Sequence, residues 1–167
     1  MQTDSSGRST NPLPPLADAN TRVLILGSLP GRASLAAARY YAHPRNQFWA
    51  LLGPVVGADL VPLDHDARLD AIARAGIGLW DVIGAAARVG SLDSAIRAAD
   101  LRDLAGLVQS LPALRLVAFN GGRAAKDGAP LLSGAGVPTL TLPSSSAALA
   151  RPLAWKQVQW QALAAYL

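Results

Sequence analysis

The sequence predicts a three-layer α/β/α sandwich with a central, mainly four-stranded parallel sheet. Short aliphatic runs alternate along the chain with segments of helical periodicity, which is the order that βα units produce. The chain has 167 residues, 51% of them hydrophobic, so it can bury one substantial core and is short for two domains. We therefore expect a single domain over residues 21–167.

Four runs have the composition of buried parallel strands. They are short, rich in aliphatic and β-branched residues, and bounded by Gly, Asn or Pro, and the first ends at Gly27. The runs are 21–26 (TRVLIL), 77–83 (IGLWDVI), 115–119 (RLVAF) and 138–142 (PTLTL).

Helical spacing of apolar residues separates these runs. Asp100 is a candidate N-cap for a helix over 101–111, and Gly121 and Gly122 open another that reaches about residue 132. Pro152 suits the first turn of the last helix, whose Leu153, Trp155, Val158 and Leu163 are expected to cover the sheet. The remaining helices are predicted over 46–57 and 66–75.

Several classes of protein are disfavoured by composition. No apolar run approaches the roughly twenty residues that cross a bilayer. Residues 1–20 lack the pattern of a secretory signal and are predicted to be a disordered leader. The chain has no cysteine, and His43 and His65 are its only histidines, so we expect no metal site and no cofactor.

The charge balance favours a polyanionic partner. The net charge is +4, the pI is about 10.1, and thirteen of the fifteen basic residues are Arg, which makes forked contacts with phosphate. A basic surface kept for solubility explains the same numbers equally well until a motif is found.

Three loops follow predicted strands and should meet at the carboxyl edge of the sheet. The loop from Gly27 to Gly31 lacks the GxGxxG spacing of a dinucleotide site, and Pro30 has no amide hydrogen for phosphate. The triple serine at 144–146 lacks the GxSxG elbow of a serine hydrolase.

Residues 27–49 (GSLPGRASLAAARYYAHPRNQFW) resemble the first motif of the mismatch-specific and hypoxanthine branches of the uracil-DNA glycosylase superfamily. These branches share a G-x-x-P-G turn, an aromatic residue and a His-Pro-x-Asn-x-Phe-Trp segment. Residues 76–97 (GIGLWDVIGAAARVGSLDSAIR) and 142–147 (LPSSSA) resemble the hypoxanthine branch in the same order. The likeness extends from about Val23 to the C-terminus.

The resemblance implies a monofunctional, metal-free, monomeric DNA glycosylase of base excision repair. Such an enzyme flips a deaminated base, hypoxanthine or uracil, out of DNA and hydrolyses its N-glycosidic bond. It would act in the cytoplasm, associated with the nucleoid. Three alternatives stay open: a catalytically silent DNA-binding member of the superfamily, a uracil/thymine mismatch-directed glycosylase, and a domain that binds a small nucleotide.

Within the first motif, the resemblance implies that a backbone turn donates to the departing base. The mismatch-specific branch holds its attacking water with an Asn at the position of Leu29, so that role would pass to Asn46, unless Asn46 only caps the following helix. His43 either donates to the base or sugar or fixes the loop. The turn consists of Ser28, Leu29, Pro30 and Gly31.

Aromatic and acidic residues complete the expected base pocket. Tyr41 occupies the position of the aromatic that stacks on the flipped base, with a core position as the alternative. Phe48 and Trp49 are expected in the core. Asp81 stands where the superfamily places a residue that reads the base edge, and its carboxylate would accept the N1–H of hypoxanthine or the N3–H of uracil.

The predicted DNA contacts lie outside the base pocket. Arg45 and Arg123 suit phosphates, although a Gly-assisted helix start explains the segment around Arg123 nearly as well. The second motif would press into the minor groove and bind phosphates through Ser144, Ser145, Ser146 and Ala147. Related sequences often carry Pro at the last of these positions.

Overall fold

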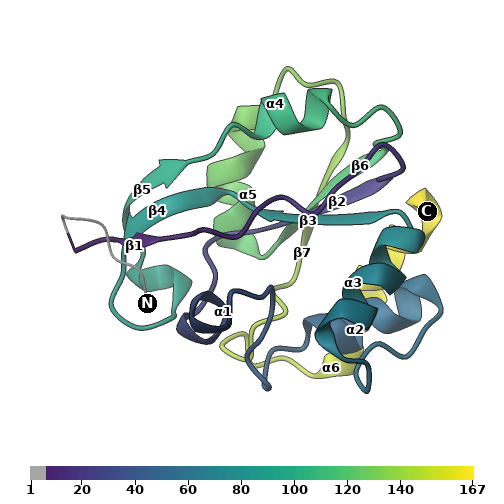
Figure 1. The fold of residues 1–167 in the computed structure, drawn as a ribbon, viewed down its shortest axis with the longest axis horizontal. Coiled ribbons are helices and arrows are strands. Elements are labelled where there is room, and N and C mark those ends of the chain that lie inside the picture. The colour runs from purple at the N-terminus through teal and green to yellow at the C-terminus, as the bar shows by residue number, and fades with distance from the viewer. Residues whose placement is uncertain (1–6) are drawn as a thin grey trace.

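The computed structural model describes residues 7–167 and has a four-stranded parallel sheet at its centre (Figure 1). The strands are, in spatial order, β3 (Ile77–Asp81), β2 (Val23–Gly27), β6 (Leu116–Asn120) and β7 (Thr139–Leu142). All three neighbouring pairs run parallel. The predicted sheet is confirmed, and each strand lies within one or two residues of its expected limits.

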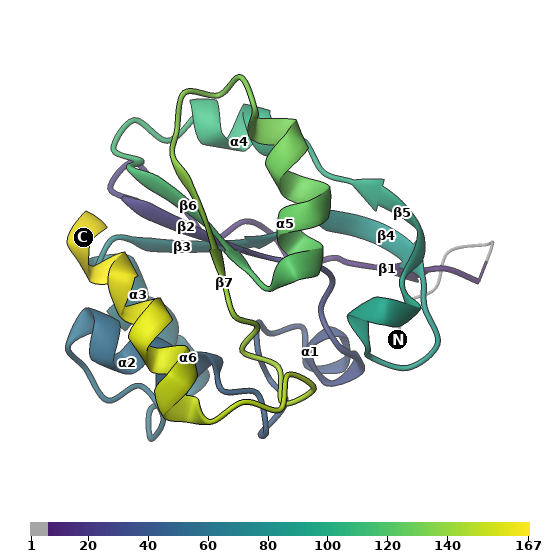
Figure 2. The same ribbon diagram turned by 180° about the vertical axis from the view of Figure 1, so that it is seen from behind.

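Helices cover both faces of this sheet, as the three-layer prediction requires (Figures 1 and 2). Alternate residues of β2 point to opposite layers: Val23 and Ile25 join one core cluster, Leu24 and Leu26 the other. No helix in residues 7–167 combines the length and apolar character needed to cross a membrane. One layer holds α2 (Phe48–Val56), α3 (His65–Arg74) and α6 (Leu153–Trp160), and the other holds α4 (Leu104–Gln109) and α5 (Gly122–Gly128).

The remaining helices are short. The six-residue α1 (Arg32–Ala37) follows the turn after β2. The 3₁₀ helices are η1 (Asp93–Ala95), η2 (Ala129–Leu132) and η3 (Gln161–Tyr166).

A small antiparallel sheet, which the sequence does not predict, adjoins the main one. It contains β1 (Ser9–Thr10), β4 (Ile83–Ala87) and β5 (Arg97–Leu101). The expected strand over 77–83 ends at Asp81, because Val82 and Ile83 donate to the carbonyls of Gly27 (2.8 Å) and Ser28 (3.0 Å) and lead the chain away. The small residues of β4 carry too little side-chain pattern to reveal this second strand.

The prediction of a disordered leader is wrong for residues 7–20 and, for residues 1–6, falls outside the described chain. Residues 9–16, which we call the N-terminal strap, lie along β4 and β3 as extended chain (Figure 1). Leu16 and Leu79 exchange two backbone hydrogen bonds of 2.8 and 2.9 Å, and Leu13 is 4% exposed. Proline prevents a helix here, but it does not prevent an extended segment from covering a sheet edge.

Two helices differ from prediction. The helix expected over 101–111 begins at Leu104, because Asp103 rather than Asp100 caps it by accepting from the Gly106 amide at 2.9 Å. Residue 101 belongs to β5 instead.

The last helix buries a different face from the one expected. Trp160 and Lys156 are fully buried. Leu163 is buried as predicted, but Leu153, Trp155 and Val158 are 41%, 43% and 78% exposed. The apolar pattern misleads here because a lysine, which rarely lies inside a protein, occupies the inward face.

Candidate active site

The carboxyl ends of β2, β3 and β6 open into one cleft of about 720 Å³. Parallel pairing places Gly27 opposite Asp81, so the ends of β2 and β3 are level. The predicted convergence of the loops after the strands is therefore observed. The cleft is lined by residues 27–34, 91–94 and 144–149, by Asp81, and by parts of 40–46 and 120–123.

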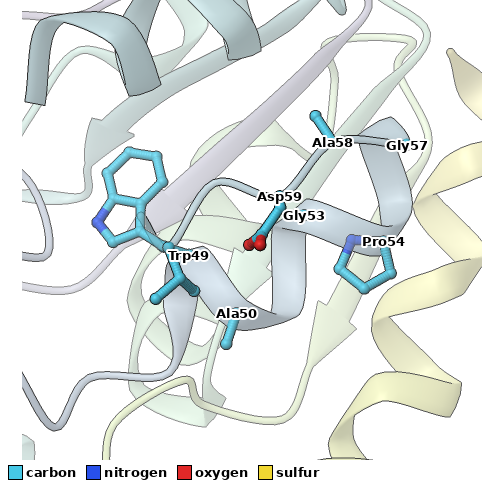
Figure 3. A pocket seen from close by; sticks show the side chains of 8 residues that line it. Trp49, Ala50, Gly53, Pro54, Gly57, Ala58 and Asp59 are labelled. Carbon is cyan, nitrogen blue, oxygen red and sulfur yellow. The ribbon is translucent and has the colours of Figure 1, made fainter. Parts of the chain in front are cut away.

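A second hollow, of about 420 Å³, lies on the outer side of α2 (Figure 3). Trp49, Pro54 and Asp59 are among the side chains around it. It is open, it holds one titratable side chain, and it does not include the strand ends. The polar and titratable side chains gather instead in the cleft at the strand ends, which we take as the candidate site.

Asp81 is the most unusual group in the cleft. It is 3% exposed, and its Oδ2 accepts a hydrogen bond of 3.1 Å from Asn11 Nδ2. Burial raises the pKa of this carboxyl from 3.8 to about 7, although the bond from Asn11 and the charge of Arg102 act in the opposite direction. Asp81 thus exchanges its proton near neutral pH.

Asp81 fits because the facing strand ends in glycine. A β-carbon at Gly27 would lie 2.6 Å from Asp81 Oδ1 and 3.2 Å from Tyr41 Oη. Such contacts are too close, so any other residue at position 27 would push the carboxyl aside. Gly27 therefore leaves the space in which Asp81 Oδ1 and the Tyr41 hydroxyl stand near each other.

Tyr41 lines the cleft but is also part of a packed aromatic group. Its ring stacks on Phe48 with a centroid distance of 3.7 Å, and its carbonyl accepts from Trp49 Nε1 at 3.2 Å. Asn120 Nδ2 donates to its hydroxyl at 3.3 Å. Burial raises the pKa of the Tyr41 phenol, which therefore stays protonated. Phe48 and Trp49 lie in the core, as predicted.

The turn after β2 is held from behind by the hairpin of β4 and β5. Arg88 donates to the carbonyls of Leu29 (3.2 Å) and Pro30. Ser28 Oγ donates to Asp93 Oδ1 at 2.7 Å. The Leu29 side chain is buried in the core, so an apolar residue there stabilises the turn. No pattern in the sequence of the hairpin predicts these contacts with the turn.

Asn46 and His43 both make local bonds that order their loop. Asn46 Oδ1 accepts from the amide of Phe48, the first residue of α2, at 3.0 Å. The N-cap position itself is Gln47, so Asn46 supports the helix start from the residue before the cap. His43 Nδ1 accepts from the Arg45 amide at 3.1 Å, so Nε2 is the ring nitrogen that this bond does not use. Both residues line the cleft, and Arg45 beside them is exposed.

The second motif divides into structural and accessible serines. Ser145 is fully buried: its amide donates to Asn120 Oδ1 and its Oγ accepts from Asn120 Nδ2, both at 2.9 Å. Its hydroxyl is thus directed to the protein instead of a phosphate. Ser144 and Ser146 are half-buried, and Ala147 is exposed at the rim of the cleft.

Arg123 is also committed to contacts within the protein. It pairs with Asp127 at 2.6 Å and donates to the carbonyls of Asp93 and Ile96, each at 3.3 Å. In this arrangement its guanidinium joins α5 to the hairpin. A phosphate role for Arg123 would require some of these bonds to break.

Both lysines lie away from the space in which a substrate would sit. Lys156 is buried, and its Nζ donates to Gln47 Oε1 (2.8 Å) and to the Ser146 carbonyl (3.1 Å). Lys126 is exposed on α5. Within residues 7–167, no three acidic or histidine side chains come close enough together to hold a metal ion.

Comparison with known proteins gives consistent results. Residues 14–164 match the family described as the Uracil DNA glycosylase superfamily. Two proteins named hypoxanthine DNA glycosylase are each 42% identical to this chain. The one from Methanosarcina acetivorans aligns over 150 residues, 90% of this chain and 94% of the relative, and the one from Methanosarcina barkeri over 147 residues, 88% and 92%.

The fold has a solved counterpart. The solution NMR structure of a candidate uracil DNA glycosylase from Methanosarcina acetivorans superposes with a TM-score of 0.83 at 41% identity. The match covers 91% of this chain and 94% of that protein.

The raised pKa of Asp81 predicts a pH-dependent stability. A carboxyl with a higher pKa in the folded than in the unfolded state makes the free energy of unfolding fall as pH rises from about 4 to about 7. Asp81→Asn removes this dependence. The free energy of unfolding of both proteins is measured with urea at the two ends of this range. The difference between Asp81→Asn and wild type should shift in favour of the variant, from the lower to the higher pH, by at least about 1.4 kcal/mol, the equivalent of one pKa unit.

Asp59→Asn, which changes an exposed carboxyl away from the cleft, is the matched control. A difference between wild type and Asp81→Asn that stays constant across the range would contradict the raised pKa.

Proposed function

The chain belongs to the uracil DNA glycosylase superfamily, and we propose that it is a monofunctional glycosylase that removes deaminated bases, hypoxanthine foremost, from DNA. The observation that carries the proposal is the cleft at the strand ends, in which a buried carboxyl that titrates near neutral pH faces the space beside the glycine turn. The relatives named for hypoxanthine support the choice of base.

The reaction has three requirements: a pocket for the flipped base, hydrogen-bond donors that face it, and a positioned water molecule. A glycosylase rotates the nucleotide out of the duplex and holds the base in a pocket. The N-glycosidic bond then breaks through an oxocarbenium-like sugar, while negative charge moves onto the departing base. Donors must therefore face the base, and a water molecule must be held near C1′.

The proposed donors are the turn after β2 and Asp81, which can donate to the base only while its carboxyl is protonated and accepts from the base when it is ionised. Because Arg88 holds the carbonyls of Leu29 and Pro30 on the hairpin side, the turn is ordered before DNA binds. The amides of Ser28, Leu29 and Gly31 are the candidate donors in this turn, since Pro30 has no amide hydrogen. Tyr41 borders the pocket, and its ring is stacked on Phe48 in the core behind it.

Asn46 is the proposed holder of the attacking water. The bond from the Phe48 amide fixes its side chain and leaves the second lone pair of Oδ1 and the Nδ2 group, which has no partner among residues 7–167. A capping bond and a catalytic contact are thus compatible in one amide. His43 lies in the same loop and is the second candidate to position the water.

DNA would approach the rim of the cleft. Arg45 is exposed beside Asn46. Ser144, Ser146 and Ala147 border the cleft close to this loop, since the Gln47 amide donates to the Ser145 carbonyl at 2.9 Å. The net charge of +4 favours the phosphate backbone. We propose that the enzyme acts as a monomer, without metal or cofactor, on cytoplasmic DNA of the nucleoid.

Excision of single lesions tests the proposal. End-labelled duplexes carrying hypoxanthine, uracil, xanthine or thymine opposite each base are incubated with excess enzyme and EDTA, and then treated with alkali. We expect the fastest strand cleavage at hypoxanthine and none at adenine. Without alkali the strand should stay intact, because neither Lys126 nor Lys156 offers the free amine in the cleft that a lyase needs.

Binding of the duplexes without release of any base would indicate a catalytically silent member. Faster release of uracil than of hypoxanthine would contradict the proposed preference.

Substitutions at Asn46 separate catalysis from capping. Asn46→Ala should lower the single-turnover rate about 100-fold or more and leave DNA affinity nearly unchanged, since a group that holds the water acts in the transition state. Asn46→Ser can still cap α2, so its melting temperature should return toward that of wild type, while its rate stays low. If Asn46→Ala keeps more than about a third of the wild-type rate, Asn46 only orders the start of the helix.

A further inference from the structure

The N-terminal strap contacts the candidate site through one side chain. Asn11 is 7% exposed and lies on the strap directly after β1, where its own amide donates to the Gly84 carbonyl at 2.8 Å. Arg102 holds the strap at this point by donating to the carbonyls of Asn11 (2.6 Å) and Leu13 (3.0 Å). The backbone at position 11 is thus bonded on both its amide and its carbonyl side.

The orientation of the Asn11 side-chain amide is determined by its neighbours. Its Oδ1 accepts from the Leu13 amide, and its Nδ2 donates to the Ile83 carbonyl and to Asp81 Oδ2, all at 3.1 Å. A flipped amide would place oxygen against the Ile83 carbonyl and nitrogen against the Leu13 amide, and both contacts would be repulsive. Asn11 therefore always presents an N–H to Asp81 Oδ2.

This bond makes the two oxygens of Asp81 unequal. Oδ2 accepts from Asn11, and carbonyl oxygen is the better acceptor, so the proton of a neutral Asp81 belongs on Oδ1. Oδ1 is the atom that stands 2.6 Å from the position of a β-carbon on Gly27, at the wall of the cleft.

We propose that Asn11 is a positioning and specificity-determining residue, which fixes the proton of Asp81 on Oδ1 and so makes the carboxyl a hydrogen-bond donor to the base. This inference rests on the proposed function.

A protonated carboxyl can separate a deaminated base from the amino-bearing base from which it arises. Deamination replaces an exocyclic amino group, which donates, by an oxo group, which accepts. An O–H group can bond the oxo group of hypoxanthine, whereas it meets the amino group of adenine donor to donor. The same bond would stabilise negative charge on the departing base.

The charged and titratable groups around Asp81 set the pH range of this donor. Arg102 faces it from the segment after β5, Arg88 and Asp93 from the hairpin, and Tyr40 and Tyr41 from the loop before α2. Asn11 adds a hydrogen bond that favours the ionised form. Removing that bond should therefore raise the pH at which Asp81 loses its proton.

The first test measures Asp81 directly and does not depend on activity. The carboxyl ¹³C signal of Asp81, assigned with Asp81→Asn, is titrated in wild type and in Asn11→Leu, a substitution of similar size without donors. We expect a midpoint about one pH unit higher in Asn11→Leu. Leu13→Val, which loosens the same strap and keeps the Asn11 bond, is the control and should retain the wild-type midpoint. An unchanged midpoint in Asn11→Leu would overturn the proposal.

The second test uses single-turnover excision of hypoxanthine between pH 5.5 and 9, which are about the limits that bracket the titration. The fall in rate at alkaline pH should move upward in Asn11→Leu with the ¹³C midpoint. The alkaline fall in rate should vanish in Asp81→Asn. Asn11 would donate to the amide oxygen of the new side chain, and the NH₂ group of that side chain would then face the cleft at every pH.

The two failures are distinguishable. If wild type releases no base, the proposed function fails, and the ¹³C titration alone decides the role of Asn11. If wild type is active but its alkaline limb does not follow the ¹³C midpoint, the donor role of Asp81 is overturned.

Discussion

The close approach of Asp81 to Gly27 at the level ends of two parallel strands is the constraint on which the site depends. A carboxyl group occupies the space that any side chain at position 27 would fill. The register of β2 and β3 thus determines both where the cleft lies and which atom faces it. Because the same place is deeply buried, the carboxyl there keeps its proton to about neutral pH.

The loops around this carboxyl are tied together beneath the cleft. Asn120, at the end of β6, bonds both Ser145 of the second motif and the hydroxyl of Tyr41. Lys156 joins Ser146 to Gln47 at the start of α2. Motifs distant in the sequence therefore have fixed relative positions before substrate binds, which is what electrostatic stabilisation of a departing base requires.

Local patterns made much of the fold predictable. The aliphatic runs of the parallel strands and the periodic helices α2 and α3 have signals within a single segment, and the order of strands and helices then implies the three layers. The motifs around Tyr41, Asn46 and Asp81 likewise predicted residues that line the cleft. Asp81 ends β3, and Tyr41 and Asn46 lie in the loop between α1 and α2.

What the sequence did not reveal depends on long-range contacts. The strap appears as a polar, proline-rich leader until its partners in β3 and β4 are known, so Asn11 gave no signal. Arg123 and Ser145 carry groups that suit phosphate, yet the fold directs them to Asp127 and Asn120. The residue type determines which groups a side chain can bind, and the tertiary structure determines which of those groups lie beside it.

We infer that a flipped base enters the cleft and meets Asp81 Oδ1. This inference is tested most directly by a crystal structure with a duplex containing 2′-fluoro-2′-deoxyinosine, whose glycosidic bond resists hydrolysis. We expect the O6 atom of the flipped base to lie within hydrogen-bond distance of Asp81 Oδ1, while Asn11 still bonds Oδ2. A base that stays stacked in the duplex, or one that enters the cleft and contacts neither oxygen of Asp81, would contradict it.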